Sequence, residues 1–164
     1  MMKVFYVLMA FQMVTWGCSV KKEEKVKDEP AFATVNEYPD LSLTLQDGTR
    51  ISTRSLQGKN MFVFFQPECD HCQQEAGEIQ QQLNSFKEYT LYFISSAPLP
   101  QVIQFSEDYG LNNKQNIKFA VTSSEGVLTH YGPIQTPSVY IYSEGKLKKS
   151  FNGQTKVENI LNNL

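Results

Sequence analysis

The sequence predicts a single α/β domain with a central mixed β-sheet flanked by helices. With 164 residues, 41% of them hydrophobic and 20% charged, the chain is long enough for one domain with a buried core. Residues 61–65 form a continuous apolar run, which is typical of a strand buried on both faces. Helical spacing follows this run directly, and further strand and helix patterns alternate after it. Such alternation indicates one α/β sheet.

A β-hairpin is expected before the buried strand, as an N-terminal extension of the sheet. Residues 41–45 alternate apolar and polar side chains, which indicates a strand with one buried face. Asp47-Gly48 follows, and this dipeptide favours a tight two-residue turn. Residues 50–53 would form the return strand.

The central segment should form a helix, a strand and a second helix. Apolar side chains at helical spacing predict a helix over residues 70–89, and these are Ala76, Ile79, Leu83 and Phe86. Residues 90–94 resemble a second buried strand. Pro100 can open the next helix, over residues 100–109, and Gly110 can stop it.

The C-terminal part should add a strand, a hairpin and a last helix. Residues 117–121 are a short strand candidate, and residues 139–142 and 146–151 are expected to pair around a turn at 143–145. Thr155 and Glu158 have the spacing of a capping box at the start of a helix. The apolar face of that helix would comprise Val157, Ile160, Leu161 and Leu164.

The N-terminus differs in composition from the rest of the chain. Lys3 precedes an apolar run over residues 4–16 that is shorter than the roughly 20 residues of a membrane-spanning helix. Residues 1–17 are therefore predicted to be a secretory signal peptide. The junction before Cys18 resembles the lipobox of bacterial lipoproteins, although Thr15 stands where that family usually has Leu. The resemblance implies that Cys18 is lipidated.

Two alternatives for the N-terminus remain: an ordinary signal-peptidase cut before an unpaired Cys18, and a retained helical anchor. Lipidation of Cys18 would leave an even pair among the three cysteines. Residues 18–31 would then be the lipidated N-terminus and a solvated tether, because four Lys balance four acidic residues there with little to bury. The folded domain would comprise residues 32–164. A net charge of −2 without a basic block argues against nucleic acid as a partner.

Cys69 and Cys72 form a C-x-x-C pair where the buried strand ends and a helix begins. The unpaired amides and the positive end of the helix dipole favour a thiolate at such a position. Cys69 is therefore predicted to be the nucleophile that attacks a substrate disulfide, and Cys72 to resolve the mixed disulfide. No cofactor beyond this redox-active pair is expected.

The cysteine pair has three alternative interpretations. It could be a structural disulfide, half of a zinc site, or part of a copper- or zinc-handling module. A metal site would need further ligands, and the two histidines, His71 and His130, are the available ones. A peroxiredoxin-like peroxidase is disfavoured, because that family places Thr three residues before its reactive cysteine, where Gln66 stands here.

Residues 41–164 resemble thioredoxin-like thiol–disulfide oxidoreductases of the TlpA and ResA type. The matching features are Asp47-Gly48, Gly58-Lys59, Pro67, the C-x-x-C pair and Thr136-Pro137. The resemblance implies a thioredoxin fold and an exported, membrane-tethered enzyme. It also implies that the Thr136–Pro137 bond is cis, that Pro137 packs opposite the cysteines, and that the Thr136 backbone pairs with a bound peptide. Glu75 matches a buried glutamate that would exchange a proton with Cys72.

Three residues beside the cysteines could tune the redox pair. His71 would stabilise a thiolate, whereas the charge of Asp70 would oppose it. Many relatives have Trp where this chain has Glu68, another acidic group that disfavours the Cys69 thiolate.

The resulting expectation is a monomeric, lipid-anchored reductase on the extracytoplasmic, periplasmic side of a membrane. It would exchange disulfides with protein substrates and draw electrons from a membrane donor.

Overall fold

The computed structural model describes residues 36–164, within a compact unit that spans Ala33–Leu164. The predicted signal peptide, the predicted tether with Cys18, and the predicted domain start near Phe32 lie outside the described residues.

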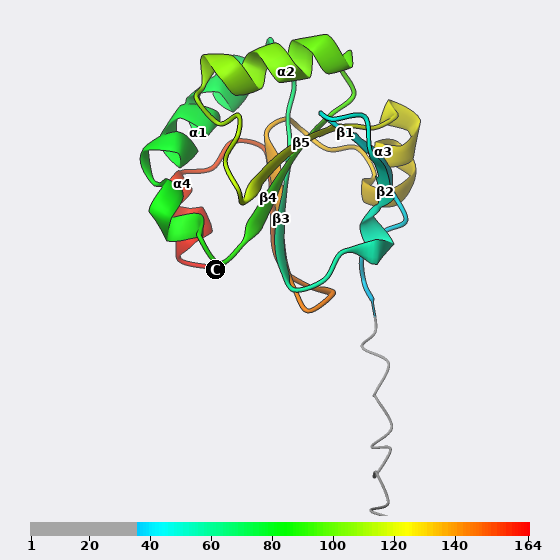
Figure 1. The fold of residues 1–164 in the computed structure, drawn as a ribbon. Helices are drawn as coiled ribbons and strands as arrows, with labels where there is room; N and C mark the ends of the chain where they lie inside the picture. Colours follow the sequence, from blue (N-terminus) through cyan, green and yellow to red (C-terminus); the bar gives the residue numbers. More distant parts are fainter. Residues whose placement is uncertain (1–35) are drawn as a thin grey trace, which may run out of the picture. The chain divides into compact units, whose positions relative to one another are not determined.

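The domain is built on a seven-stranded mixed sheet with the strand order β2-β1-β5-β4-β3-β6-β7 (Figure 1). Parallel pairs join β3 to β4 and β4 to β5, and all other neighbours are antiparallel. The strands are β1 (Ser42–Leu45), β2 (Arg50–Ser52), β3 (Lys59–Phe64), β4 (Thr90–Ser95), β5 (Ile117–Val121), β6 (Ser138–Ser143) and β7 (Lys146–Asn152). Strand β3, the apolar run of the sequence, lies between β4 and β6. The predicted mixed sheet with an N-terminal hairpin is confirmed.

The two hairpins close in different ways. The turn between β6 and β7 has two consecutive residues with positive φ, Glu144 at 50° and Gly145 at 76°. That geometry matches the twist of the strands and is a two-residue turn. The turn between β1 and β2 is longer: Gly48 has a φ of 84° and donates to Leu45 O. The tight two-residue turn predicted at Asp47-Gly48 is therefore wrong in length.

Helix α1 (Asp70–Gln81) is shorter than predicted. A 3₁₀ segment, η2 (Leu83–Phe86), follows it in place of further α-helix. Leu83 and Phe86 are three residues apart, a spacing that suits three residues per turn as well as the α-helical period. The apolar pattern therefore placed Phe86 correctly in the core but could not tell the two helix types apart.

The other helices are α2 (Leu99–Asp108), α3 (Ser124–Tyr131) and α4 (Val157–Leu161). Helix α2 was expected, whereas α3 was not. The signals for α3 are present in the sequence: Ser123 caps its N-terminus by accepting from Gly126 N, and Gly132 ends it with a φ of 70°. Its weak apolar stripe explains why it was missed, since no α3 residue is fully buried.

The last helix begins differently from the prediction. Its N-cap is Lys156, and no side chain caps it. The Thr155 hydroxyl instead accepts a bond from the Asn159 amide at 3.4 Å. The predicted capping box of Thr155 and Glu158 is therefore wrong, although Val157 and Ile160 are buried as expected.

The sheet separates two apolar layers. Helices α1, α2 and α4 contribute to one layer, which contains Cys72 together with Val63, Phe65 and Phe93. The second layer includes Phe62, Phe64 and Tyr142, and α3 packs Val127 and Tyr131 against it. Figure 1 shows α1 and α4 on one side of the strands and α3 on the other. Each fully buried large side chain contributes about 1.5–3 kcal/mol of stability.

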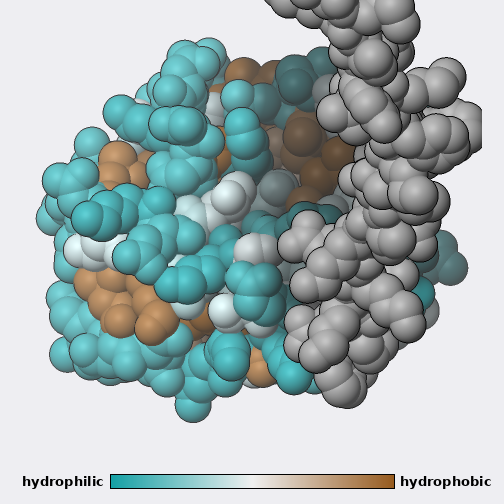
Figure 2. All heavy atoms as spheres, turned by 60° about the horizontal axis from the view of Figure 1, so that its bottom comes forward, coloured by the Kyte–Doolittle hydropathy of each residue, from teal (hydrophilic) through white to brown (hydrophobic). Residues whose placement is uncertain are grey.

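The surface is mostly hydrophilic, with separate apolar areas on the face drawn in Figure 2. The exposed large apolar side chains of the described chain are Leu128, Leu147 and Leu164. From residue 36 to the C-terminus, no helix combines the length and apolar character that crossing a membrane requires.

Candidate active site

Cys69 is the N-cap residue of α1, and the four residues 65–68 separate it from the end of β3 at Phe64. Its Sγ accepts a hydrogen bond from Cys72 N at 3.3 Å, and its carbonyl accepts from Gln73 N at 3.0 Å. Its own amide donates to Gln66 O at 3.1 Å. The sulfur therefore occupies the place that a capping oxygen normally takes, where the helix N-terminus favours negative charge. Cys69 is partly exposed, as a nucleophile must be.

Cys72 lies one turn further along α1 and is nearly inaccessible, with 2% of its surface exposed. Burial raises the pKa of its thiol to about 12, and the hydrogen bond with Cys69 adds to the rise. Both cysteines are free thiols in the structure. The first thiol is therefore accessible and the second is buried, whereas the order of attack stays a prediction.

The Thr136–Pro137 peptide bond is cis, as the resemblance predicted. Pro137 is buried, and the carbonyl of Thr136 accepts a hydrogen bond from the Cys69 thiol at 3.6 Å. The antiparallel register that pairs Phe64 with Ser138 brings this segment beside the end of β3. The cysteine pair and Thr136 therefore form one site, although 67 positions separate Cys69 from Thr136 in the chain.

Glu75 is buried on α1, three residues after Cys72, with 2% of its surface exposed. Neither carboxylate oxygen has a hydrogen-bond partner. Burial raises the pKa of Glu75 to about 8, and the charge of Glu78 raises it further. The backbone of Thr155 faces the carboxylate and partly opposes this rise without completing a hydrogen bond. Glu75 is thus a buried carboxyl group with a raised pKa, three residues from Cys72 and on the same face of α1.

The three predicted tuning residues, Glu68, Asp70 and His71, are all exposed around Cys69. Asp70 is the acidic residue of the first turn of α1, where a carboxylate stabilises the helix through its dipole. Glu68 lines a groove of about 340 Å³ with residues of α1 and α2, among them Asp108. The groove beside the loop that precedes Cys69 therefore carries two acidic side chains, Glu68 and Asp108.

His130 lies on α3 and is exposed. Within residues 36–164, no three His, Cys, Asp or Glu side chains come together as a metal site would require. The cysteine pair supplies two thiol ligands, and the described part of the chain brings no third ligand to them.

Gln66 contributes to the site in a way that the sequence did not suggest. Its side-chain amide donates to Ser96 Oγ at 2.8 Å, and its side-chain oxygen accepts from Ser95 Oγ at 3.1 Å. Both serines lie at the carboxyl end of β4, so these bonds tie the loop before Cys69 to the neighbouring strand. The Gln66 side chain thus bonds to β4, whereas its backbone carbonyl accepts from the Cys69 amide.

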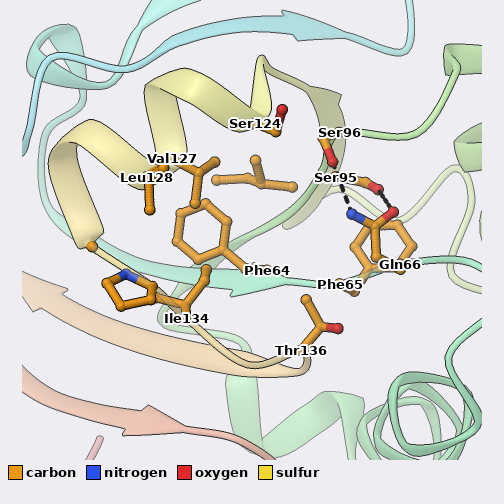
Figure 3. A pocket seen from close by; sticks show the side chains of 13 residues that line it. Phe64, Phe65, Gln66, Ser95, Ser96, Ser124, Val127, Leu128, Ile134 and Thr136 are labelled. Atoms are coloured by element: carbon orange, nitrogen blue, oxygen red, sulfur yellow. Dashed lines mark hydrogen bonds between the residues drawn. The ribbon is translucent and has the colours of Figure 1, made fainter.

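A cavity of about 230 Å³ opens next to this network, and we call it the α3 pocket (Figure 3). It lies between α3 and the ends of β3 and β4, and Thr136 forms part of its wall. Its lining comprises Phe64, Phe65, Gln66, Ile94, Ser95, Ser96, Ser124, Val127, Leu128, Gly132, Pro133, Ile134 and Thr136. The sequence did not reveal this pocket, because α3 itself was not predicted.

A model described as the AhpC/TSA family matches residues 35–150. No curated protein matches the chain.

Solved structures share the fold at low sequence identity. A secreted *Mycobacterium tuberculosis* disulfide oxidoreductase homologous to *E. coli* DsbE aligns over 76% of this chain and 93% of its own, with 18% identity and a TM-score of 0.65. A putative protein disulfide isomerase from *Bacteroides thetaiotaomicron* aligns over 77% and 84%, with 19% identity and a TM-score of 0.65. *Arabidopsis thaliana* ScoI with copper bound aligns over 74% and 91%, with 17% identity and a TM-score of 0.59. The predicted thioredoxin fold is confirmed.

Proposed function

This chain belongs to the AhpC/TSA family, and from that premise we propose that it is a membrane-tethered, extracytoplasmic thiol–disulfide oxidoreductase that reduces disulfides of exported proteins. The observation that carries the proposal is the pairing of a partly exposed Cys69 at the start of α1 with a buried Cys72 one turn later. Thr136 completes the site with a backbone carbonyl at the attacking sulfur.

The reaction proceeds by two exchanges. The Cys69 thiolate attacks one sulfur of a substrate disulfide, the substrate S–S bond breaks, and the departing substrate thiolate takes up a proton. The Cys72 thiol then loses its proton and attacks Cys69 Sγ, which breaks the mixed disulfide and releases the second substrate thiol. Two electrons and two protons pass to the substrate, and the Cys69–Cys72 disulfide remains.

Glu75 acts in the second exchange as a proton acceptor. Burial holds the pKa of Cys72 at about 12, so its attack requires a base. The pKa of Glu75, at about 8, allows this carboxyl group to take up and release a proton near neutral pH. Glu75 is a positioning and proton-transfer group for Cys72, on the same face of α1.

The surroundings of the two thiols support our proposal that electrons flow from this chain to its substrates. A disulfide becomes strongly oxidising when its reduced form is stabilised, as in DsbA. Burial keeps Cys72 as an unionised thiol, and the residues on either side of Cys69, Glu68 and Asp70, are exposed carboxylates rather than cations. These features favour a reductant.

An exported reductant needs a source of electrons, and we propose a membrane donor as the partner that restores the dithiol. The apolar segment before Cys18 supports export and a lipid anchor at that residue. The chain would act as a monomer on protein disulfides, without nucleic acid and without a cofactor beyond the cysteine pair.

Replacing Cys72 by Ser tests the exchange mechanism. The variant lacks the resolving thiol, so we expect mixed disulfides between Cys69 and cell-envelope proteins to accumulate on non-reducing gels and to vanish with reductant. The double variant Cys69→Ser with Cys72→Ser is the control, because it retains Cys18. Adducts of equal yield in the control, or none in Cys72→Ser, would overturn the mechanism.

A further inference from the structure

The α3 pocket has no part in the exchange chemistry itself, yet it adjoins the attacking sulfur. Thr136 belongs to both places: its carbonyl accepts from Cys69 Sγ at 3.6 Å, and it lines the pocket. Gln66 is also shared, since it lines the pocket and its carbonyl accepts from the Cys69 amide. The pocket therefore adjoins the sulfur to which a substrate polypeptide would be joined.

The chemistry of the lining determines what fits there. Phe64, Val127 and Ile134 provide apolar walls, and no charged residue lines the pocket. Leu128 stands at its rim with 59% of its surface exposed, the largest exposure among the large apolar side chains of the described chain. Figure 3 shows Val127 and Leu128 projecting from α3 toward Phe64 and Ile134. An apolar group gains by entering this pocket, whereas a charged group would lose hydration without finding a partner.

The size of the pocket limits the occupant. At about 230 Å³ it is smaller than the roughly 300–1,000 Å³ of sites that enclose a whole small molecule. It suits one amino-acid side chain. An extended chain advances about 3.3–3.6 Å per residue, so only residues close to the attacked cysteine reach it.

We propose that the α3 pocket selects disulfide-bearing polypeptides that carry a bulky apolar side chain within two residues of the cysteine attacked by Cys69. This inference rests on the proposed exchange function and names the substrate class of the same site. The Ser96 and Ser124 hydroxyls at the pocket give the neighbouring substrate backbone uncharged hydrogen-bonding groups.

Three synthetic peptides of equal length test the proposal. Each has one cysteine in a disulfide with 5-thio-2-nitrobenzoate, and the residue after the cysteine is Leu, Gly or Asp. The full-length chain carries Cys18→Ser, so that Cys69 and Cys72 are its only thiols. Attack on the peptide sulfur releases the coloured thiolate, which gives a second-order rate constant for each peptide.

We expect the Leu peptide to react about three- to tenfold faster than the Gly peptide, and the Asp peptide to react more slowly than either. Leu128→Asp places a charge at the rim, and because Leu128 is exposed we expect the variant to keep its fold. The variant should bring the Leu-to-Gly rate ratio close to one. Leu147→Asp, at an exposed leucine on β7, is the matched control and should keep the ratio of the parent.

The rate ratio is compared within each protein, so a general loss of active protein leaves it unchanged. A ratio near one in the parent, or an undiminished ratio in Leu128→Asp, would overturn the pocket assignment while leaving the exchange function intact. If no peptide reacted, and glutathione disulfide did not react either, the exchange function would fail and the pocket assignment would fall with it.

Discussion

Cys69 and Cys72 differ sharply in environment although two residues separate them. The turn from β3 into α1 leaves the Cys69 sulfur partly exposed as the helix cap, and the first helical turn carries Cys72 into the core. The C-x-x-C spacing at the start of a helix is enough to produce this difference in exposure, because the helix geometry behind it is local. The partner of Cys69 across the site, Thr136, came from the family resemblance and not from any local pattern.

Glu75 gives the protein a pH-dependent stability. Burial raises its pKa from 4.5 to about 8. Between pH 4.5 and about pH 8, Glu75 retains a proton in the folded protein that it has lost in the unfolded chain. The stability of the folded protein therefore falls as the pH rises through this range. We expect Glu75→Gln, which stays neutral, to be more stable than the parent above pH 8, by up to about 5 kcal/mol, and similar to it near pH 4. Urea denaturation across this pH range measures the difference.

The same variant should also lose activity. Without a carboxyl group to accept the proton of Cys72, release of the second substrate thiol should slow at neutral pH. Glu158→Gln, at an exposed glutamate in the first turn of α4, is the control; it should leave the rates unchanged and alter stability by less than about 1 kcal/mol. A Glu75→Gln protein with parental stability and parental rates at every pH would show that Glu75 is not a buried proton carrier.

At the scale of elements, strands were easier to predict than helix ends. The run over residues 61–65 and the two hairpins mark their strands through side-chain patterning alone. The end of α1 and the start of α4 depend on tertiary contacts, so the predicted helix to residue 89 and the predicted Thr155 cap were wrong. Helix α3 was missed because its contribution to the second apolar layer is made by half-buried side chains.

Helix α3 should depend on its N-terminal cap. The Ser123 hydroxyl accepts from Gly126 N at 3.0 Å. We expect Ser123→Ala to lower the free energy of unfolding by about 1 kcal/mol. Ser124→Ala, one residue later, removes an exposed hydroxyl that caps nothing and should change stability by less than about 0.5 kcal/mol. Equal denaturation midpoints for the two variants would contradict the capping role.

At the scale of the whole molecule, the sheet brings together two segments that are far apart in the chain. The parallel pairing of β3 with β4 and its antiparallel pairing with β6 set the Cys69 turn between the Ser95-Ser96 end of one strand and the Thr136-Pro137 start of the other. The groove lined by Glu68 and the uncharged α3 pocket both lie beside this turn. Neither could be predicted from spacing, since each is lined by residues of several elements.

The most direct test of the central claim is the reduction potential of the Cys69–Cys72 pair. The protein with Cys18→Ser would be equilibrated in graded thiol–disulfide buffers, and its free thiols counted after alkylation. We predict a reversible two-electron transition near or below the roughly −270 mV of thioredoxin, as a reductant requires. A potential toward the roughly −120 mV of DsbA, or no reversible disulfide at all, would contradict the account.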